Sequence, residues 1–147
     1  MSMNSIRVID PGWPWDDGLS FVPGVCVGST LYVSGQLPVD ANGALVGPED
    51  MEAQARCIFE NIEKILHVAG ASLDDVVKLT CYCTDFKDYA AYSKVRGEKF
   101  TKRFTASTTV GVPSLLVPGA LLEVDAIALV QNPVASDGRS NKPHGQI

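Results

Sequence analysis

The sequence has no long hydrophobic run. No apolar stretch approaches the roughly 20 residues that a helix needs to cross a bilayer, and the opening segment Met1–Arg7 is not followed by the apolar core of a signal peptide. We therefore expect a cytoplasmic protein with no membrane partner. Hydrophobic residues make up 46% and charged residues 20% of the chain, as in an ordinary globular domain. This composition excludes a disordered or collagen-like chain.

Positive charge is scarce. Lys and Arg number 12 against 17 Asp and Glu, which gives a net charge of −5, and the basic residues are scattered apart from Lys99, Lys102 and Arg103. A nucleic-acid-binding protein normally carries a basic stripe that displaces counterions from phosphates. We therefore expect no nucleic-acid partner. The negative net charge does not exclude anionic small molecules as ligands, because one arginine or a nest of backbone amides can bind them.

Residues that hold metals or act as activated nucleophiles are few or unsuitably spaced. Cys81 and Cys83 lie two apart on a predicted strand and lack the CxxC spacing of zinc or redox sites, as do Cys26 and Cys57. We expect all four to be reduced and packed as small hydrophobes. The two histidines, His67 and His144, lie far from any plausible nucleophile, and no phosphate-binding glycine loop is present. The sequence predicts neither a metal nor a cofactor.

A length of 147 residues suits one domain. We place that domain at 1–130 and expect a flexible tail over 131–147, which is rich in Asn, Pro, Ser and Gly. Periodicity and turn residues predict six strands and two helices in the order β-β-β-α-β-α-β-β. The strands are expected at 6–9, 19–27, 30–33, 76–82, 108–112 and 121–130, and the helices at 49–69 and from Thr84 or Asp85 to about Phe104.

Two helices can cover only one face of such a sheet, yet both faces of its last strand are substantially apolar. Leu122, Val124 and Ala126 point to one side, whereas Ile127 and Leu129 share the other side with Glu123 and Asp125. The second face needs a cover that this chain does not supply. Self-association is the economical solution.

Several segments together resemble one known family. The run Leu31–Asp40, which contains Ser34-Gly35-Gln36, resembles the SGQ-P-D signature of the RidA/YjgF (Rid) family. The predicted helix Glu52–Gly70 with the following Ala71–Lys78 matches further family blocks, and so do Thr84-Asp85-Phe86 and Leu122–Ala128. The resemblance spans residues 20 to 130, and it is specific only in combination.

The resemblance implies an α+β fold similar to chorismate mutase: a two-layer sandwich with a mixed six-stranded sheet and two helices on one face. It also implies a homotrimer whose sheets form an inner barrel, with a ligand cleft at each subunit interface. The family's best-known activity is hydrolysis of reactive enamines and imines to ketones and ammonia, without a cofactor. Some relatives carry an endoribonuclease label, which fits poorly with the acidic charge of this chain.

Site positions follow from the same resemblance. A carboxylate on the last strand orients the attacking water in the family, and Asp125 matches it as the catalytic residue. Glu123 shares its strand face, and two carboxylates this close can raise one pKa and so create a proton donor. The substrate-binding positions match Phe21, Ser34, Gly35, Ser93, Ser107 and Thr109.

One family feature is missing. Ser107 stands where the family's 2-imino acid deaminases carry the arginine that clamps the substrate carboxylate. Serine replaces neither its charge nor its two-pronged geometry, so we do not expect a general 2-imino acid deaminase. Arg96 or Arg103 could supply a charge from another direction, and this point stays open. The leading hypothesis is a hydrolytic deaminase of a small reactive enamine or imine. The alternative is a non-catalytic trimer that binds a small metabolite.

Overall fold

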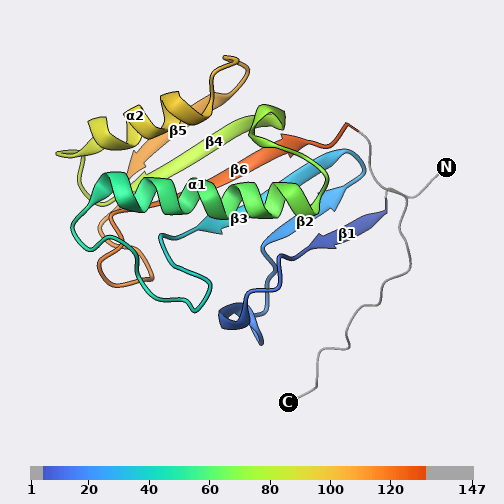
Figure 1. Cartoon of the computed structure of the whole chain (residues 1–147), viewed down its shortest axis with the longest axis horizontal. Coiled ribbons are helices and arrows are strands. Elements are labelled where there is room, and N and C mark those ends of the chain that lie inside the picture. The colour runs from blue at the N-terminus through green and yellow to red at the C-terminus, as the bar shows by residue number, and fades with distance from the viewer. Residues whose placement is uncertain (1–4, 132–147) are drawn as a thin grey trace.

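The computed structural model describes residues 5–131, so nearly all of the tail expected at 131–147 lies outside the described residues. Within these residues there are six strands: β1 (Ile6–Ile9), β2 (Gly24–Val27), β3 (Thr30–Gln36), β4 (Val76–Cys83), β5 (Ala106–Gly111) and β6 (Leu122–Leu129). The same part of the chain forms two α-helices, α1 (Met51–Val68) and α2 (Tyr89–Lys99), and short 3-10 turns at Pro14–Asp16 and Leu73–Asp75. Both helices lie on one face of a single sheet, as Figure 1 shows.

The sheet has the order β1-β2-β3-β6-β4-β5. Neighbouring strands are antiparallel except β4 and β5, which are parallel because α2 connects them. The sheet is therefore mixed, and the predicted two-layer α+β fold is confirmed. β6 is the last strand within residues 5–131 but lies at the centre of the sheet, between β3 and β4.

The core lies between the sheet and α1. The Asp50 side chain caps the helix by accepting a hydrogen bond from the Ala53 N–H. Burying each large apolar side chain on this face contributes about 2 kcal/mol. Gly24 lets α1 approach β2 closely, since a Cβ there would lie 3.0 Å from Cγ2 of Ile65. The helix side chains in this core are Met51, Ala55, Ile58, Phe59, Ile62, Ile65 and Leu66.

The bounds of three elements differ most from the sequence prediction. The second helix begins at Tyr89 and ends at Lys99, so the predicted start at Thr84 or Asp85 and end near Phe104 are wrong. Asp85 instead closes a turn by accepting a hydrogen bond from the Lys87 N–H at 2.8 Å. Strand β2 begins only at Gly24, directly after a proline, whereas β3 continues past its predicted end to Gln36.

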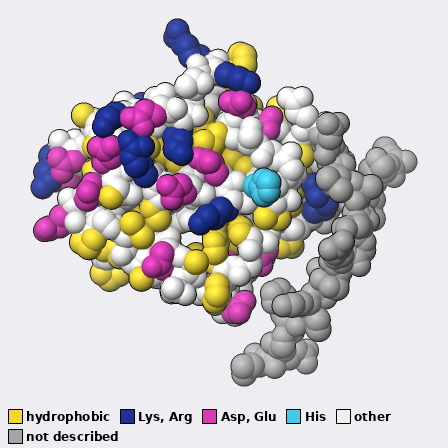
Figure 2. Space-filling view, in the orientation of Figure 1, with side chains coloured by type: hydrophobic (Ala, Val, Ile, Leu, Met, Phe, Trp, Pro, Cys, Tyr) yellow, Lys and Arg dark blue, Asp and Glu magenta, His cyan; other side chains and the backbone are white. Residues whose placement is uncertain are grey.

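The sheet face opposite the helices, here called the open face, carries exposed apolar side chains. These are Ile6, Val8, Tyr32, Val110 and Leu129. The helix-covered face differs, because Lys and Arg intermingle there with Asp and Glu over the helices, as Figure 2 shows. Neither helix within residues 5–131 is long and apolar enough to cross a membrane.

Candidate functional site

A β-bulge on β3 brings three of the predicted site residues together. Val33 pairs with Ala126 and Gln36 pairs with Val124, so both Ser34 and Gly35 face a single residue of β6. That residue is Asp125. The Ser-Gly pair and the predicted catalytic carboxylate are thus neighbours, although they are far apart in the sequence.

Ser34 ties the bulge to the segment that carries Phe21. Its Oγ donates a 2.6 Å hydrogen bond to the carbonyl of Val22, and its N–H donates to the carbonyl of Pro23 at 2.9 Å. Both donors of Ser34 are therefore used within the chain. Phe21, next to this anchor, is an exposed aromatic side chain. Ser34 in this geometry positions the Phe21 segment beside the bulge.

Gly35 provides the space for a second carboxylate. A Cβ at this position would overlap Oε1 of Glu123, so the carboxylate lies directly against the bulge backbone. Glu123 is half-buried, and its desolvation, together with the nearby charge of Asp125, raises the pKa of the Glu123 carboxyl. A carboxyl with a raised pKa can hold and donate a proton nearer neutral pH.

Asp125 is oriented by Tyr82 on the neighbouring strand. The Tyr82 hydroxyl donates a 2.9 Å hydrogen bond to Oδ2 of Asp125. This bond, with some burial and the charge of Asp125, raises the pKa of Tyr82. Sequence reasoning did not single out Tyr82. Tyr82 lies on β4 directly opposite Glu123. Finding it from the sequence would have required knowing the strand order and the register of β4 against β6.

The other predicted binding residues form a second cluster around Arg96. Its Nη1 donates hydrogen bonds to Oη of Tyr89 at 3.1 Å and to Oγ of Ser107 at 3.3 Å, while Nη2 donates to Oγ of Ser93 at 3.3 Å. Oγ1 of Thr109 lies 3.1 Å from the Tyr89 hydroxyl. Ser93, Ser107 and Thr109 are thus joined by two residues of α2, and a guanidinium reaches the Ser107 position from the helix.

The two clusters lie on opposite faces of the sheet. Ser107 pairs with Leu79, whose side chain is buried beneath the helices, so Ser107 points to the helix side. Asp125 pairs with Thr80, one residue further along β4, and points to the open face. Within one chain, therefore, the predicted site residues do not form a single pocket.

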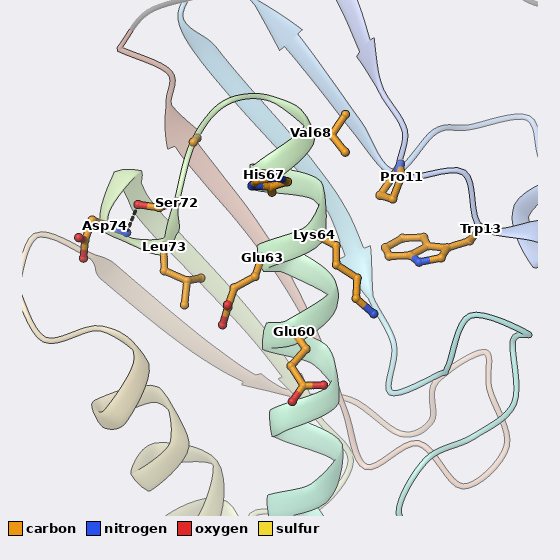
Figure 3. A pocket seen from close by; sticks show the side chains of 11 residues that line it. Pro11, Trp13, Glu60, Glu63, Lys64, His67, Val68, Ser72, Leu73 and Asp74 are labelled. Carbon is orange, nitrogen blue, oxygen red and sulfur yellow. Dashed lines mark hydrogen bonds between the residues drawn. The ribbon is translucent and has the colours of Figure 1, made fainter.

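A broad hollow lies elsewhere, across the outer side of α1. It has a volume of about 890 Å³ and none of the predicted site residues line it. In Figure 3, Trp13 and Pro11 lie on one side of the helix and Leu73 and Asp74 on the other. The hollow therefore straddles the helix surface rather than enclosing a ligand. Between residues 5 and 131, no group of three or more His, Cys, Asp or Glu side chains is arranged to hold a metal.

Comparison with known proteins gives a consistent result. The family model described as Endoribonuclease L-PSP matches residues 18–130. A RutC family protein of Pyrococcus abyssi is 40% identical over 102 residues, which is 69% of this chain and 80% of that protein. A RutC family protein of Saccharolobus solfataricus is 41% identical over 105 residues, covering 71% of this chain and 82% of the relative.

A solved structure shares the fold closely. The crystal structure of YyfA from Yersinia pestis, described as a member of the conserved Rid protein family of unknown function, superposes with a TM-score of 0.78 and 32% sequence identity. The match covers 86% of this chain and all of that one. The residues matched by the family model, 18–130, contain both clusters described above.

Proposed function

This chain belongs to the Rid family, the family described as Endoribonuclease L-PSP, and on that premise we propose that it hydrolyses a small reactive imine or enamine. In the reaction, water adds to the carbon of the C=N bond to give a carbinolamine. Proton transfer to nitrogen then lets the C–N bond break, releasing a carbonyl compound and ammonia. An enamine enters the same route after protonation at carbon gives the imine. No redox step and no cofactor are needed.

The observation that carries this proposal is the pair of unlike carboxylates at the Ser34–Gly35 bulge. Asp125 is held by the Tyr82 hydroxyl, and Glu123 lies half-buried against Gly35 with a raised pKa. Two carboxyl groups in different environments can divide acid and base roles. Asp125 orients the water that attacks the imine carbon, and Glu123 supplies the proton to the departing nitrogen.

We also propose that the working protein is a homotrimer with its sites between subunits. Two observations support this assembly. The exposed apolar side chains of the open face are better covered than solvated, and the two clusters face opposite sides of the sheet. A ligand that contacts both clusters must lie where β5, an edge strand, of one copy meets the open face of the next.

The test is a turnover assay on two kinds of imine. An amino-acid oxidase generates 2-iminobutanoate from 2-aminobutanoate, and an amine oxidase generates the uncharged benzaldimine from benzylamine. Semicarbazide reacts with the imine faster than with the carbonyl product, so catalysed hydrolysis lowers the initial rate of semicarbazone formation. We expect the wild-type protein to accelerate hydrolysis of at least one imine. Asp125→Asn should abolish this acceleration and leave the oligomer, measured by light scattering, unchanged.

Two outcomes contradict the proposal. If wild-type protein accelerates neither hydrolysis, the chemistry is wrong and the alternative of a metabolite-binding trimer takes its place. Full turnover by Asp125→Asn would remove Asp125 from the mechanism. A matched control is Asp17→Asn, which makes the same change at an exposed aspartate of the loop before β2. It should retain wild-type turnover.

A further inference from the structure

Arg96 differs from the basic residues that form ion pairs on the helix surface. The salt bridges between described residues join Arg56 with Glu52 and Glu98, Lys94 with Glu52, Lys99 with Glu63, and Lys102 with Asp74. Arg96 takes part in none of them, although it is partly buried. Every hydrogen-bond partner of its guanidinium among residues 5–131 is a neutral hydroxyl. The positive charge of Arg96 is therefore fixed in position by hydrogen bonds but is not neutralised by a carboxylate of the described residues.

The guanidinium is also held in a fixed orientation. Its Cζ lies 5.2 Å from the ring centroid of Tyr92, which is fully buried, and 6.0 Å from that of Tyr89. The hydroxyls of Ser93 and Ser107 contact different terminal nitrogens, so they fix the plane of the group. An arginine ordered before binding loses little conformational entropy when a ligand arrives.

The surroundings of Arg96 suit a carboxylate. Hydroxyls accept hydrogen bonds from the guanidinium, and the same groups can rotate to donate to an anion. Ser107 and the neighbouring face of β5 are exposed, so a ligand can reach the cluster from the sheet edge. A planar two-oxygen group matches the guanidinium with two parallel hydrogen bonds.

We propose that Arg96 binds the carboxylate of the ligand, with Ser93 and Ser107 as positioning residues that hold its guanidinium. The inference rests on the proposed function only in taking that ligand to be the substrate or its product. It assigns to Arg96, on α2, the carboxylate-binding role that Ser107, on β5, cannot fill, and so makes Arg96 the residue that selects a ligand carrying a carboxylate.

The test measures binding of 2-oxobutanoate to the full-length protein by calorimetry or ligand-observed NMR. Butanone, which lacks the carboxylate, is the comparison ligand. We expect wild-type protein to bind 2-oxobutanoate at least tenfold more tightly than butanone. Arg96→Gln should weaken 2-oxobutanoate binding at least tenfold, whereas Arg96→Lys, which keeps the charge but not the two-pronged geometry, should give an intermediate value.

The matched control is Lys94→Gln. It removes one positive charge from the same helix, but Lys94 is directed to Glu52 on α1, so binding should stay within twofold of wild type. Circular dichroism checks that each variant is folded, and if Arg96→Gln is unfolded the comparison between Arg96→Lys and wild type decides. Equal binding by wild type and Arg96→Lys would then overturn the proposal.

The inference and the proposed function can fail separately. Wild-type binding that does not distinguish 2-oxobutanoate from butanone, or that folded Arg96→Gln retains in full, overturns the role of Arg96 even if imines are hydrolysed. Arginine-dependent binding without any turnover supports the role of Arg96 and overturns the deaminase. A carboxylate-binding protein without hydrolytic activity would then remain.

Discussion

The hydroxyl of Tyr82 on β4 donates a 2.9 Å hydrogen bond to Oδ2 of Asp125 on β6. This bond fixes one carboxylate oxygen and leaves the other free to accept from water. Tyr82→Phe keeps the ring and removes the donor. We expect kcat for imine hydrolysis to fall about tenfold, the loss for one hydrogen bond to a charged group, with KM little changed.

The control for this change is Tyr32→Phe, an exposed tyrosine on β3 that also faces the open side of the sheet. It removes an equivalent hydroxyl from the same face but not the one bound to Asp125. If both variants lose activity equally, the Tyr82 hydroxyl has no special role. If neither does, Asp125 needs no fixed orientation.

Gly35 is the second position where a small change should have a large effect. A methyl group at 35 would overlap Oε1 of Glu123 and push the carboxylate away from the bulge. We expect Gly35→Ala to lose most turnover, at least tenfold, while the protein stays folded. The measurement is kcat/KM together with circular dichroism.

Gly97→Ala is its matched control. A Cβ at 97 meets nothing within 4 Å, and the position lies inside α2. Alanine favours a helix over glycine by about 1 kcal/mol, so this variant should be slightly more stable and should keep its activity. Wild-type turnover in Gly35→Ala would show that Glu123 can move without consequence.

The raised pKa of Glu123 predicts how stability depends on pH. Because the folded state binds this proton more tightly than the unfolded state, stability falls as the pH rises from 4.5, the ordinary pKa of glutamate, and the loss is complete above the raised pKa of Glu123. Glu123→Gln removes that cost. We expect its Tm to exceed that of wild type by about 2 °C at pH 8, and the difference to vanish on acidification below 4.5, the ordinary pKa of glutamate.

Thermal unfolding at a series of pH values checks this prediction. Glu60→Gln, at an exposed position on α1, makes the same chemical change without relieving a buried charge. Its effect on Tm should be small at every pH. A constant difference between Glu123→Gln and wild type from pH 3.5 to 8 would mean that ionisation of Glu123 costs the fold nothing.

The contact between Arg96 and Ser107 predicts an exchange of roles. Oγ of Ser107 lies 3.3 Å from Nη1 of Arg96. Ser107→Arg alone would therefore bring a second positive charge into the cluster, and we expect the repulsion to displace Arg96 and to weaken 2-oxobutanoate binding. In the double variant Arg96→Ser with Ser107→Arg, one guanidinium returns to the cluster from β5. Its binding should recover to within about fivefold of wild type. If Ser107→Arg bound 2-oxobutanoate as tightly as wild type and the double variant did not, the two positions would not be able to exchange the carboxylate-binding role.

Much of the fold could be predicted because hydrophobic periodicity and turn residues specify it locally. The apolar stripe of α1 and the β-branched run of β4 are clear in the sequence. The start of α2 could not be predicted, because Asp85 satisfies a turn as readily as a helix N-cap, and only the structure shows that it bonds to Lys87.

The sequence indicated most residues of the candidate site, but it did not predict how these residues are arranged in space. The resemblance indicated Ser93, Ser107 and Asp125, yet which sheet face each one occupies depends on strand register, which a single sequence does not specify. Arg96 was one of two arginines left open. Its side chain lies beside Ser107 because β5 packs next to α2, a contact made only in the folded chain.

The central place of β6 has a consequence for how this protein folds. Thr30 pairs with Leu129, so the two halves of the sheet are joined by a strand that lies about a hundred residues further along the chain than its partner. Until β6 docks, the hairpin β2–β3 and the strand β4 have no common partner, and their edges stay unpaired. Closing the sheet therefore requires a contact between distant parts of the chain, which makes folding slow and leaves strand edges exposed to aggregation until β6 is in place.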